Sequence, residues 1–243
     1  MQSNLRISLW SGPRNISTAL MYSFAQRADT RVFDEPLYGH YLRVTNADEY
    51  HPGAAETKAT YDQNGERVIR DVMFGDYAES VLFFKNMTHF LVDLDWGFMD
   101  GLCNVLLTRD PRDMLPSYAK QIHQPSMRDV GYEDHIKLLT WLRARGQNPA
   151  ILDSAEILKN PEGVLRKLCE HIGIAFDPAV LSWEAGKRPE DGPWGQYWYH
   201  NVWKSTGFAP YKPKTEPFPE HLKPLLDKCL PFYEQLSAQA IKA

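Results

Sequence analysis

The sequence predicts a three-layer α/β fold, in which helices cover both faces of a central parallel sheet. Two observations support this prediction: short apolar strands alternate with helices along most of the chain, and the first strand runs directly into a small polar loop that opens a helix. Strands joined through helices pair in parallel, and a parallel sheet needs cover on both faces. In such folds ligands bind beyond the carboxyl ends of the strands, so functional residues are expected at that edge.

The first part of the chain predicts two strands, one helix and an irregular insertion. Residues 7–11 have the apolar character of a buried strand, and residues 15–28 repeat apolar side chains at helical spacing. Residues 31–34 form a short strand candidate, which Glu35 and a following proline close. Residues 37–62 are polar and mixed in pattern, so we expect an irregular or short-helical insertion there.

The middle of the chain predicts two buried strands, each of which ends at a cationic side chain. Residues 80–84 indicate a strand that ends at Lys85, and residues 104–108 indicate a strand that ends at Arg109. Asp110 is then a good N-cap, and the proline after it suits the first position of a helix. A helix is therefore expected directly after the second of these strands.

The last part of the chain predicts one more strand and the helices that cover it. Residues 133–145 indicate a helix and residues 149–153 a strand, and a long amphipathic helix runs through residues 161–173 between a proline and a glycine. Residues 220–243 predict a closing helix that breaks near Pro231, because proline removes a helical hydrogen bond. The whole chain, residues 1–243, is expected to form a single domain.

Residues 184–216, here called the aromatic segment, have no steady period and many large aromatic side chains among glycines and prolines. We expect a long loop. It is either a surface excursion held down by its aromatic side chains or a lid over a functional site, since long ordered loops often carry function. Its aromatic residues include Trp194, Tyr197, Trp198, Tyr199, Trp203 and Tyr211.

Composition excludes several classes of function. With a formal net charge of -4 and a pI near 6.1, the chain lacks the basic surface that nucleic acids require. No apolar stretch reaches membrane-spanning length, and no signal segment precedes the first strand. The 3 cysteines are widely spaced and the 8 histidines lack ligand spacing, so we expect reduced thiols, no metal and a cytoplasmic protein. The oligomeric state is not predicted.

The loop after the first strand has the chemistry of a phosphate cradle. A helix start offers unpaired backbone N–H groups and a positive dipole end, and an arginine and two hydroxyls add further donors. The ATPase motif G-x-x-x-x-G-K-[ST] is absent, and an ordinary strand-to-helix turn is an equal alternative for this loop taken alone. The residues of this phosphate loop are Gly12, Pro13, Arg14, Asn15, Ile16, Ser17 and Thr18.

Four of the predicted strand ends place functional groups at the same edge of the sheet. They are the phosphate loop, the Glu35 carboxylate, the Lys85 ammonium and the Arg109 guanidinium. Each one alone could be an ordinary solvated surface charge. Four together favour a binding site for an anionic ligand at that edge.

Three motifs resemble those of the sulfotransferase family, whose donor is 3′-phosphoadenosine 5′-phosphosulfate. Residues 13–18 resemble the family's P-K-S-G-T-T loop, and residues 109–118 resemble R-N-P-x-D-x-x-x-S-Y more closely. The run 158–174 resembles the helix after the family's fourth core strand. The resemblance implies a P-loop-like sheet and transfer of a sulfuryl group to a hydroxyl or amine of a small acceptor.

The resemblance also implies roles for particular residues. Arg109 and Ser117 would bind the 3′-phosphate of the donor, and the phosphate loop would bind its 5′-phosphosulfate. Some bacterial carbohydrate members resemble the Asp34-Glu35-Pro36 run, with the glutamate as proposed base, whereas many animal members use a histidine that His89 resembles. We expect Glu35 to be the base, with His89 as the alternative, and Lys85 and Arg14 to stabilise charge on the oxygens of the transferred group.

The chain departs from the family pattern at three positions. Arg14 replaces the usual lysine, Pro116 sits inside the helix that carries Ser117, and Trp198 stands where the family's last motif has a lysine. These departures keep two other functions open. One is an ATP-dependent small-molecule kinase on the same fold, and the other is a nucleotide-binding protein without turnover.

Overall fold

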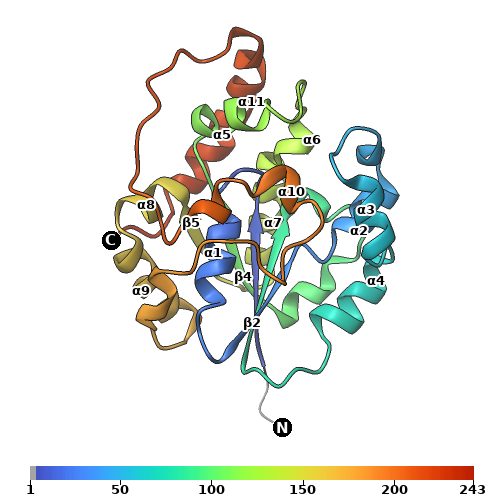
Figure 1. Cartoon of the computed structure of the whole chain (residues 1–243), viewed down its shortest axis with the longest axis vertical. Coiled ribbons are helices and arrows are strands. Elements are labelled where there is room, and N and C mark those ends of the chain that lie inside the picture. Colours follow the sequence, from blue (N-terminus) through green and yellow to red (C-terminus); the bar gives the residue numbers. More distant parts are fainter. Residues whose placement is uncertain (1–3) are drawn as a thin grey trace.

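A computed structural model describes residues 4–243 and places five strands in one parallel sheet of order β2-β3-β1-β4-β5 (Figure 1). The predicted α/β fold is confirmed. Alternate residues of each strand face opposite sides of the sheet, and apolar side chains on both sides meet helices. The strands are β1 (Leu5–Ser11), β2 (Thr30–Asp34), β3 (Val81–Met87), β4 (Cys103–Thr108) and β5 (Ala150–Asp153).

Helices pack on both faces of the sheet and over its carboxyl edge. The helices before β4 are α1 (Ser17–Phe24), α2 (Tyr38–Val44), α3 (Ala54–Thr60) and α4 (Gly65–Val68), the last continued by a π-helical turn, Ile69–Met73. The helices after it are α5 (Pro111–Tyr118), α6 (Met127–Val130), α7 (Tyr132–Ala144), α8 (Ser154–Lys159), α9 (Pro161–Ile172), α10 (Gly195–Trp198) and α11 (Lys223–Ser237). Short 3-10 turns occupy Ala47–Glu49, Thr88–Phe90, Trp96–Gly101, Pro178–Leu181, Val202–Lys204 and Glu220–Leu222.

Two hydrophobic cores form, one on each face. Ile7, Phe83 and Leu107 point to the face that α1, α8 and α9 cover, whereas Leu82 and Leu106 point to the face that α2, α7 and α11 cover. In Figure 1 α8 and α9 lie on the left of the sheet and α2, α3 and α4 on the right. Within residues 4–243, no helix combines the length and apolar composition that crossing a bilayer requires.

The strand order creates a crevice between the carboxyl ends of β1 and β4. The chain leaves β1 through α1 toward β2 on one side, and it leaves β4 through α7 toward β5 on the other. Neighbouring strands whose connections diverge in this way leave room for a ligand at their carboxyl ends. In Figure 1 this end of the sheet is uppermost, below α5, α6 and α10.

Two predicted boundaries and one predicted helix break differ from the structure. Helix α1 spans Ser17–Phe24 rather than the predicted 15–28, and it starts at Ser17 because Ile16 adopts a left-handed backbone that cannot be part of a helix. Strand β3 continues two residues beyond Lys85, so this lysine lies inside the strand. Helix α11 runs unbroken through Pro231, which is exposed, so water can satisfy the carbonyl that the proline leaves unpaired.

The aromatic segment contains little regular structure. Only α10 and the 3-10 turn Val202–Lys204 interrupt it. It is nonetheless well packed, since Trp194 and Tyr199 are buried in one core and Trp183, just before the segment, in the other. Residues 37–62, as predicted, form short helices within irregular chain.

Candidate functional site

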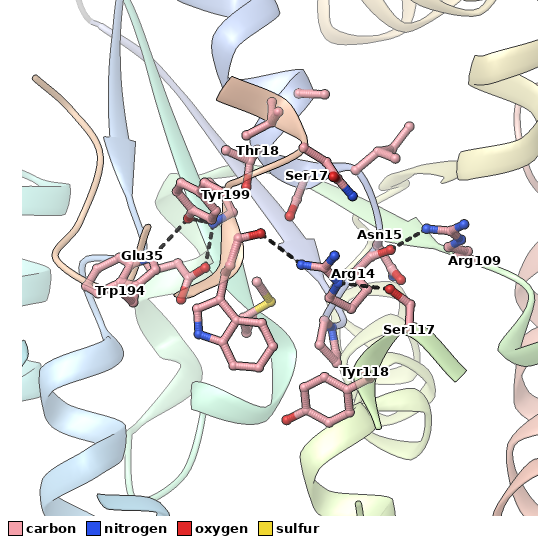
Figure 2. A pocket seen from close by; sticks show the side chains of 18 of the residues that line it. Arg14, Asn15, Ser17, Thr18, Glu35, Arg109, Ser117, Tyr118, Trp194 and Tyr199 are labelled. Carbon is pink, nitrogen blue, oxygen red and sulfur yellow. Dashed lines mark hydrogen bonds and ion pairs between the residues drawn. The ribbon is translucent and has the colours of Figure 1, made fainter. Parts of the chain in front are cut away.

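A cavity of about 390 Å³ lies at the carboxyl edge of the sheet, and it brings together most of the residues that the sequence singled out (Figure 2). All the predicted site residues except Gly12 line it, namely Pro13, Arg14, Asn15, Ile16, Ser17, Thr18, Glu35, Lys85, His89, Arg109 and Ser117. They come from the loops after β1, β2 and β4, from the start of α1, from strand β3 itself at Lys85, from the 3-10 turn after β3 at His89, and from α5 at Ser117. The crevice between diverging strands is therefore where the candidate site lies.

Gly12 lies behind the cavity wall rather than on it. A Cβ at this position would come within 2.9 Å of the carbonyl oxygen of Val130. Glycine is therefore required here because two backbone segments approach closely. The prediction that Gly12 contacts the ligand is wrong, and its role is in packing.

The phosphate loop has an unusual backbone that the surrounding structure holds in place. Arg14 and Ile16 have φ values of 58° and 59°, a left-handed region that is strained for a β-branched side chain. The Asn15 side chain donates to the carbonyl of Leu107 in β4 at 3.1 Å, and Arg109 donates to the carbonyl of Arg14 at 2.7 Å. Helix α1 begins without a side-chain cap, so its first N–H groups stay available to an anion.

Arg14 lies between helix α5 and the aromatic segment and contacts both. Its Nε donates to the Ser117 hydroxyl at 3.2 Å, and its Nη1 donates to the carbonyl of Trp198 at 2.9 Å. Figure 2 shows this guanidinium between α5 and the aromatic segment. Burial, together with the nearby Arg109 guanidinium, lowers the pKa of Arg14. Two neighbouring, partly buried arginines favour a ligand that brings negative charge between them.

Helix α5 places Ser117 beside the phosphate loop. The predicted cap is confirmed, since the Asp110 carboxylate accepts from the N–H of Arg112 at 2.8 Å and a proline begins the helix. Pro116 does not interrupt the helix, which ends two residues later. Ser117 reaches the cavity, although in this structure its partner is Arg14 rather than Arg109.

A buried ion-pair cluster forms the opposite end of the cavity. The Lys85 ammonium donates to Asp34 Oδ1 at 2.8 Å, to Glu35 Oε1 at 2.5 Å and to the Tyr199 hydroxyl at 2.6 Å. Burial alone would lower the pKa of Lys85, but the two carboxylates outweigh it and raise that pKa. Burial raises the pKa of Glu35 to about 7, although Lys85 opposes this shift. All three N–H donors of the lysine are engaged.

The aromatic segment contributes directly to this cluster, which the sequence did not predict. The Tyr199 hydroxyl also contacts both oxygens of Asp34 at 2.9 and 2.8 Å, and Trp194 donates to it at 2.9 Å. The N–H of Gly192 donates to the same aspartate at 3.0 Å. Figure 2 shows Trp194 and Tyr199 beside Glu35. The only sequence signal for these residues was the density of aromatic side chains in the segment.

Replacing Tyr199 with phenylalanine should lower the free energy of unfolding by about 1–3 kcal/mol, because Lys85 and Asp34 lose a buried hydrogen-bonding partner without a change in shape. Chemical denaturation of both proteins measures the difference. Tyr197→Phe is the matched control two residues away in the chain. The Tyr197 hydroxyl makes only a long contact with Glu56, at 3.5 Å, so this change should alter the free energy of unfolding by no more than about 0.5 kcal/mol. Equal effects of the two changes would contradict a special role for Tyr199.

His89 reaches the same cavity, from a 3-10 turn directly after β3. Its ring stands edge-on to Tyr41 and Phe90, with ring centroids 5.2 and 4.8 Å apart. Burial lowers the pKa of His89 to about 3, so this imidazole is neutral and weakly basic at pH 7. A general base works best when its pKa is near the working pH, which favours Glu35 over His89.

Other groups line the cavity that the sequence analysis did not assign to the site. Tyr38 and His51, from the insertion after β2, line it, as do Tyr118, Trp198 and Lys214. Trp198 stacks on Tyr118 with ring centroids 5.8 Å apart. Within residues 4–243, no group of three or more His, Cys, Asp or Glu side chains is placed to hold a metal ion.

Sequence comparisons match the chain to a described domain family and to two curated proteins. A sequence model described as a sulfotransferase domain matches residues 5–240. Two curated proteins of Arabidopsis thaliana, named branched-chain-amino-acid aminotransferase-like proteins 1 and 2, are each 38% identical to the chain over 231 residues, which is 95% of this chain. The chain spans 41% of the length of these relatives.

Solved structures show the same fold at low sequence identity. The sulfotransferase domain from the curacin biosynthetic pathway is 15% identical with a TM-score of 0.53, and the alignment covers 100% of both chains. A sulfotransferase from Alicyclobacillus acidocaldarius is 13% identical with a TM-score of 0.53, covering 99% of this chain and 97% of its own. The sulfotransferase domain of the Synechococcus PCC 7002 olefin synthase is 13% identical with a TM-score of 0.52, covering 94% and 95%.

Proposed function

Because the chain belongs to the sulfotransferase domain family, we propose that it transfers a sulfuryl group from 3′-phosphoadenosine 5′-phosphosulfate to a hydroxyl or amine of a small acceptor. One observation carries the proposal. A single cavity holds the uncapped start of α1, two neighbouring arginines and a buried carboxylate whose pKa is raised to about 7. The first two suit a phosphorylated donor and the third suits removal of a proton from the acceptor.

The residues present fit the donor nucleotide. The α1 N–H groups and the side chains of Ser17 and Thr18 would bind the 5′-phosphosulfate, because each offers a donor toward an anion. Arg109 and Ser117 would bind the 3′-phosphate, and Arg14 would neutralise charge between the two ends. When the donor binds, Arg14 exchanges its contacts with Ser117 and the Trp198 carbonyl for contacts with anionic oxygens.

The proposed transfer needs a base, an electrophilic centre and a stabilised leaving group. Glu35 accepts the proton of the acceptor hydroxyl, the acceptor oxygen forms a bond to sulfur, and the bond from sulfur to the bridging phosphate oxygen breaks with its electron pair on that oxygen. Arg14 lies where it can stabilise the oxygen that departs as phosphate. No net proton is lost, since Glu35 holds the one that the acceptor releases.

Lys85 can assist this step only if it exchanges one of its present contacts. Its three donors are engaged by Asp34, Glu35 and Tyr199. Protonation of Glu35 weakens one of these contacts, because a neutral carboxyl attracts the ammonium less than a carboxylate does. The same proton transfer therefore releases a Lys85 donor toward the sulfuryl oxygens.

Adenosine 3′,5′-bisphosphate should stabilise the fold without a divalent cation. At 100 times its dissociation constant the ligand adds about 2.7 kcal/mol to the free energy of unfolding, because it binds only the folded state. Thermal melts with and without the ligand, in the presence of a chelator, measure the shift. A shift with ATP and magnesium but none with the bisphosphate would contradict the proposal and point to a kinase on the same fold.

A further inference from the structure

One side of the cavity is built from aromatic rings, here called the aromatic wall: Tyr38, His51, His89, Phe90 and Trp194. All five residues are buried. Tyr38 stacks on Phe90 with ring centroids 4.9 Å apart and meets the edge of Trp194 at 4.9 Å, and His89 meets the edge of Phe90 at 4.8 Å. The wall adjoins Glu35, whose carbonyl accepts from the N–H of Tyr38 at 2.9 Å. A molecule presenting a group to Glu35 therefore lies against these rings.

The wall carries no charge at neutral pH. Burial lowers the pKa of His51 to about 4 and that of His89 to about 3, so both imidazoles are neutral. Two carboxylates near the wall have partners: Glu35 accepts from Lys85 through Oε1, and Asp129 accepts from Ser126 and Tyr50. An ammonium or a second anionic group on a ligand would be desolvated here without a partner. The wall therefore favours an uncharged body.

His51 presents an unused hydrogen-bonding atom. The Tyr38 hydroxyl lies 2.7 Å from His51 Nδ1, and this is its only hydrogen bond to the part of the chain that the structure describes. We assign the hydroxyl proton to the bond with Nδ1, and in this assignment the ring proton lies on Nε2. His51 is 8% exposed, and its Nε2 is buried without a partner among residues 4–243. A buried N–H without a partner is costly, and a ligand oxygen would remove that cost.

The unpaired Nδ1 of His89 is placed differently. It lies beside the bare backbone of Gly131, where an added Cβ would stand 3.4 Å away. Of the two histidines in the wall, we therefore assign His51 as the one whose free N–H binds the ligand.

We propose that the aromatic wall is the acceptor site, and that the acceptor is an uncharged hydroxyl compound with a ring-sized apolar body and an ether or carbonyl oxygen that accepts from His51 Nε2. The inference that the acceptor carries a hydroxyl depends on the proposed sulfuryl transfer. The inferences about its apolar body and its second oxygen depend only on the residues of the aromatic wall. His51 is thus a specificity residue, and Tyr38 fixes its tautomer.

Matched phenols test this assignment. The 2-, 3- and 4-methoxyphenols and the corresponding ethylphenols have similar size and the same hydroxyl, but only the methoxy compounds offer a second oxygen. Titration calorimetry, with and without adenosine 3′,5′-bisphosphate, should show at least one methoxy isomer binding about tenfold more tightly than its ethyl partner. His51→Leu should abolish that preference at unchanged bisphosphate affinity, and His51→Gln, which keeps an N–H donor, should retain part of it.

Three results would overturn the assignment: no phenol binds the unaltered chain, no isomer pair shows a preference, or the preference persists in His51→Leu. Tyr38→Phe is a second variant. It removes the hydroxyl that holds His51 in one tautomer, so it should weaken the preference for the methoxy compound without abolishing binding. Because the readout is binding, it is independent of turnover. A preserved preference without any sulfuryl transfer would refute the proposed function and leave the acceptor site standing.

Discussion

Replacing Glu35 with glutamine should lower the rate of sulfuryl transfer by about 100- to 10,000-fold and leave the affinity for adenosine 3′,5′-bisphosphate nearly unchanged. The carboxylate lies in the cavity beside Lys85, with burial raising its pKa to about 7. A base with this pKa is partly ionised at neutral pH and still strong enough to take the proton. Glutamine keeps the shape of the side chain but cannot accept a proton.

The pH dependence of the rate gives this prediction a second readout. Glu35 acts as a base only when ionised, so the rate should rise with pH through about 7 and then level off. The residual activity of Glu35→Gln should lack that rise. Initial rates across pH 5–9 with a working acceptor measure both profiles.

His89 supplies the comparison that decides between the two candidate bases. His89→Asn should cost less, because burial lowers the pKa of this imidazole to about 3 and leaves it a weak base. If His89→Asn abolished transfer while Glu35→Gln kept it, the assignment would be reversed. The chain would then resemble the members that use a histidine base.

Replacing Arg109 with alanine should weaken binding of adenosine 3′,5′-bisphosphate by roughly 2–4 kcal/mol while adenosine 5′-monophosphate binding changes little. Arg109 follows β4 and lines the cavity, and one of its donors holds the carbonyl of Arg14 at 2.7 Å. The other donors of the guanidinium can bind a phosphate. Calorimetric titration of both nucleotides into both proteins measures the two losses.

The comparison of nucleotides separates two roles of Arg109. If it served only to hold the phosphate loop through Arg14, both nucleotides would lose affinity equally, and contact with the 3′-phosphate would be refuted. Arg112→Ala is the matched control on the same motif. Its side chain is exposed and pairs with Asp110, so neither nucleotide should be affected.

The sequence by itself determined the fold class, the identity of the strands and most of the candidate site. Runs of apolar residues and helix caps such as Asp110 act over a few residues, so they can be read locally. Parallel strands then bring their carboxyl ends to one edge, which is why Glu35 and Arg109 were expected together. Helix α11 shows the limit of this reasoning, since Pro231 is tolerated where water meets its freed carbonyl.

Only the tertiary structure decided which partners these residues have. Lys85 contacts Tyr199 across a separation of 114 residues, and Arg14 contacts the Trp198 carbonyl across 184. A periodic pattern reports which side of an element is buried but not which distant segment covers it. The free donor of His51 depends on the same folding of distant segments, because burial by the tertiary structure makes an unpaired N–H significant.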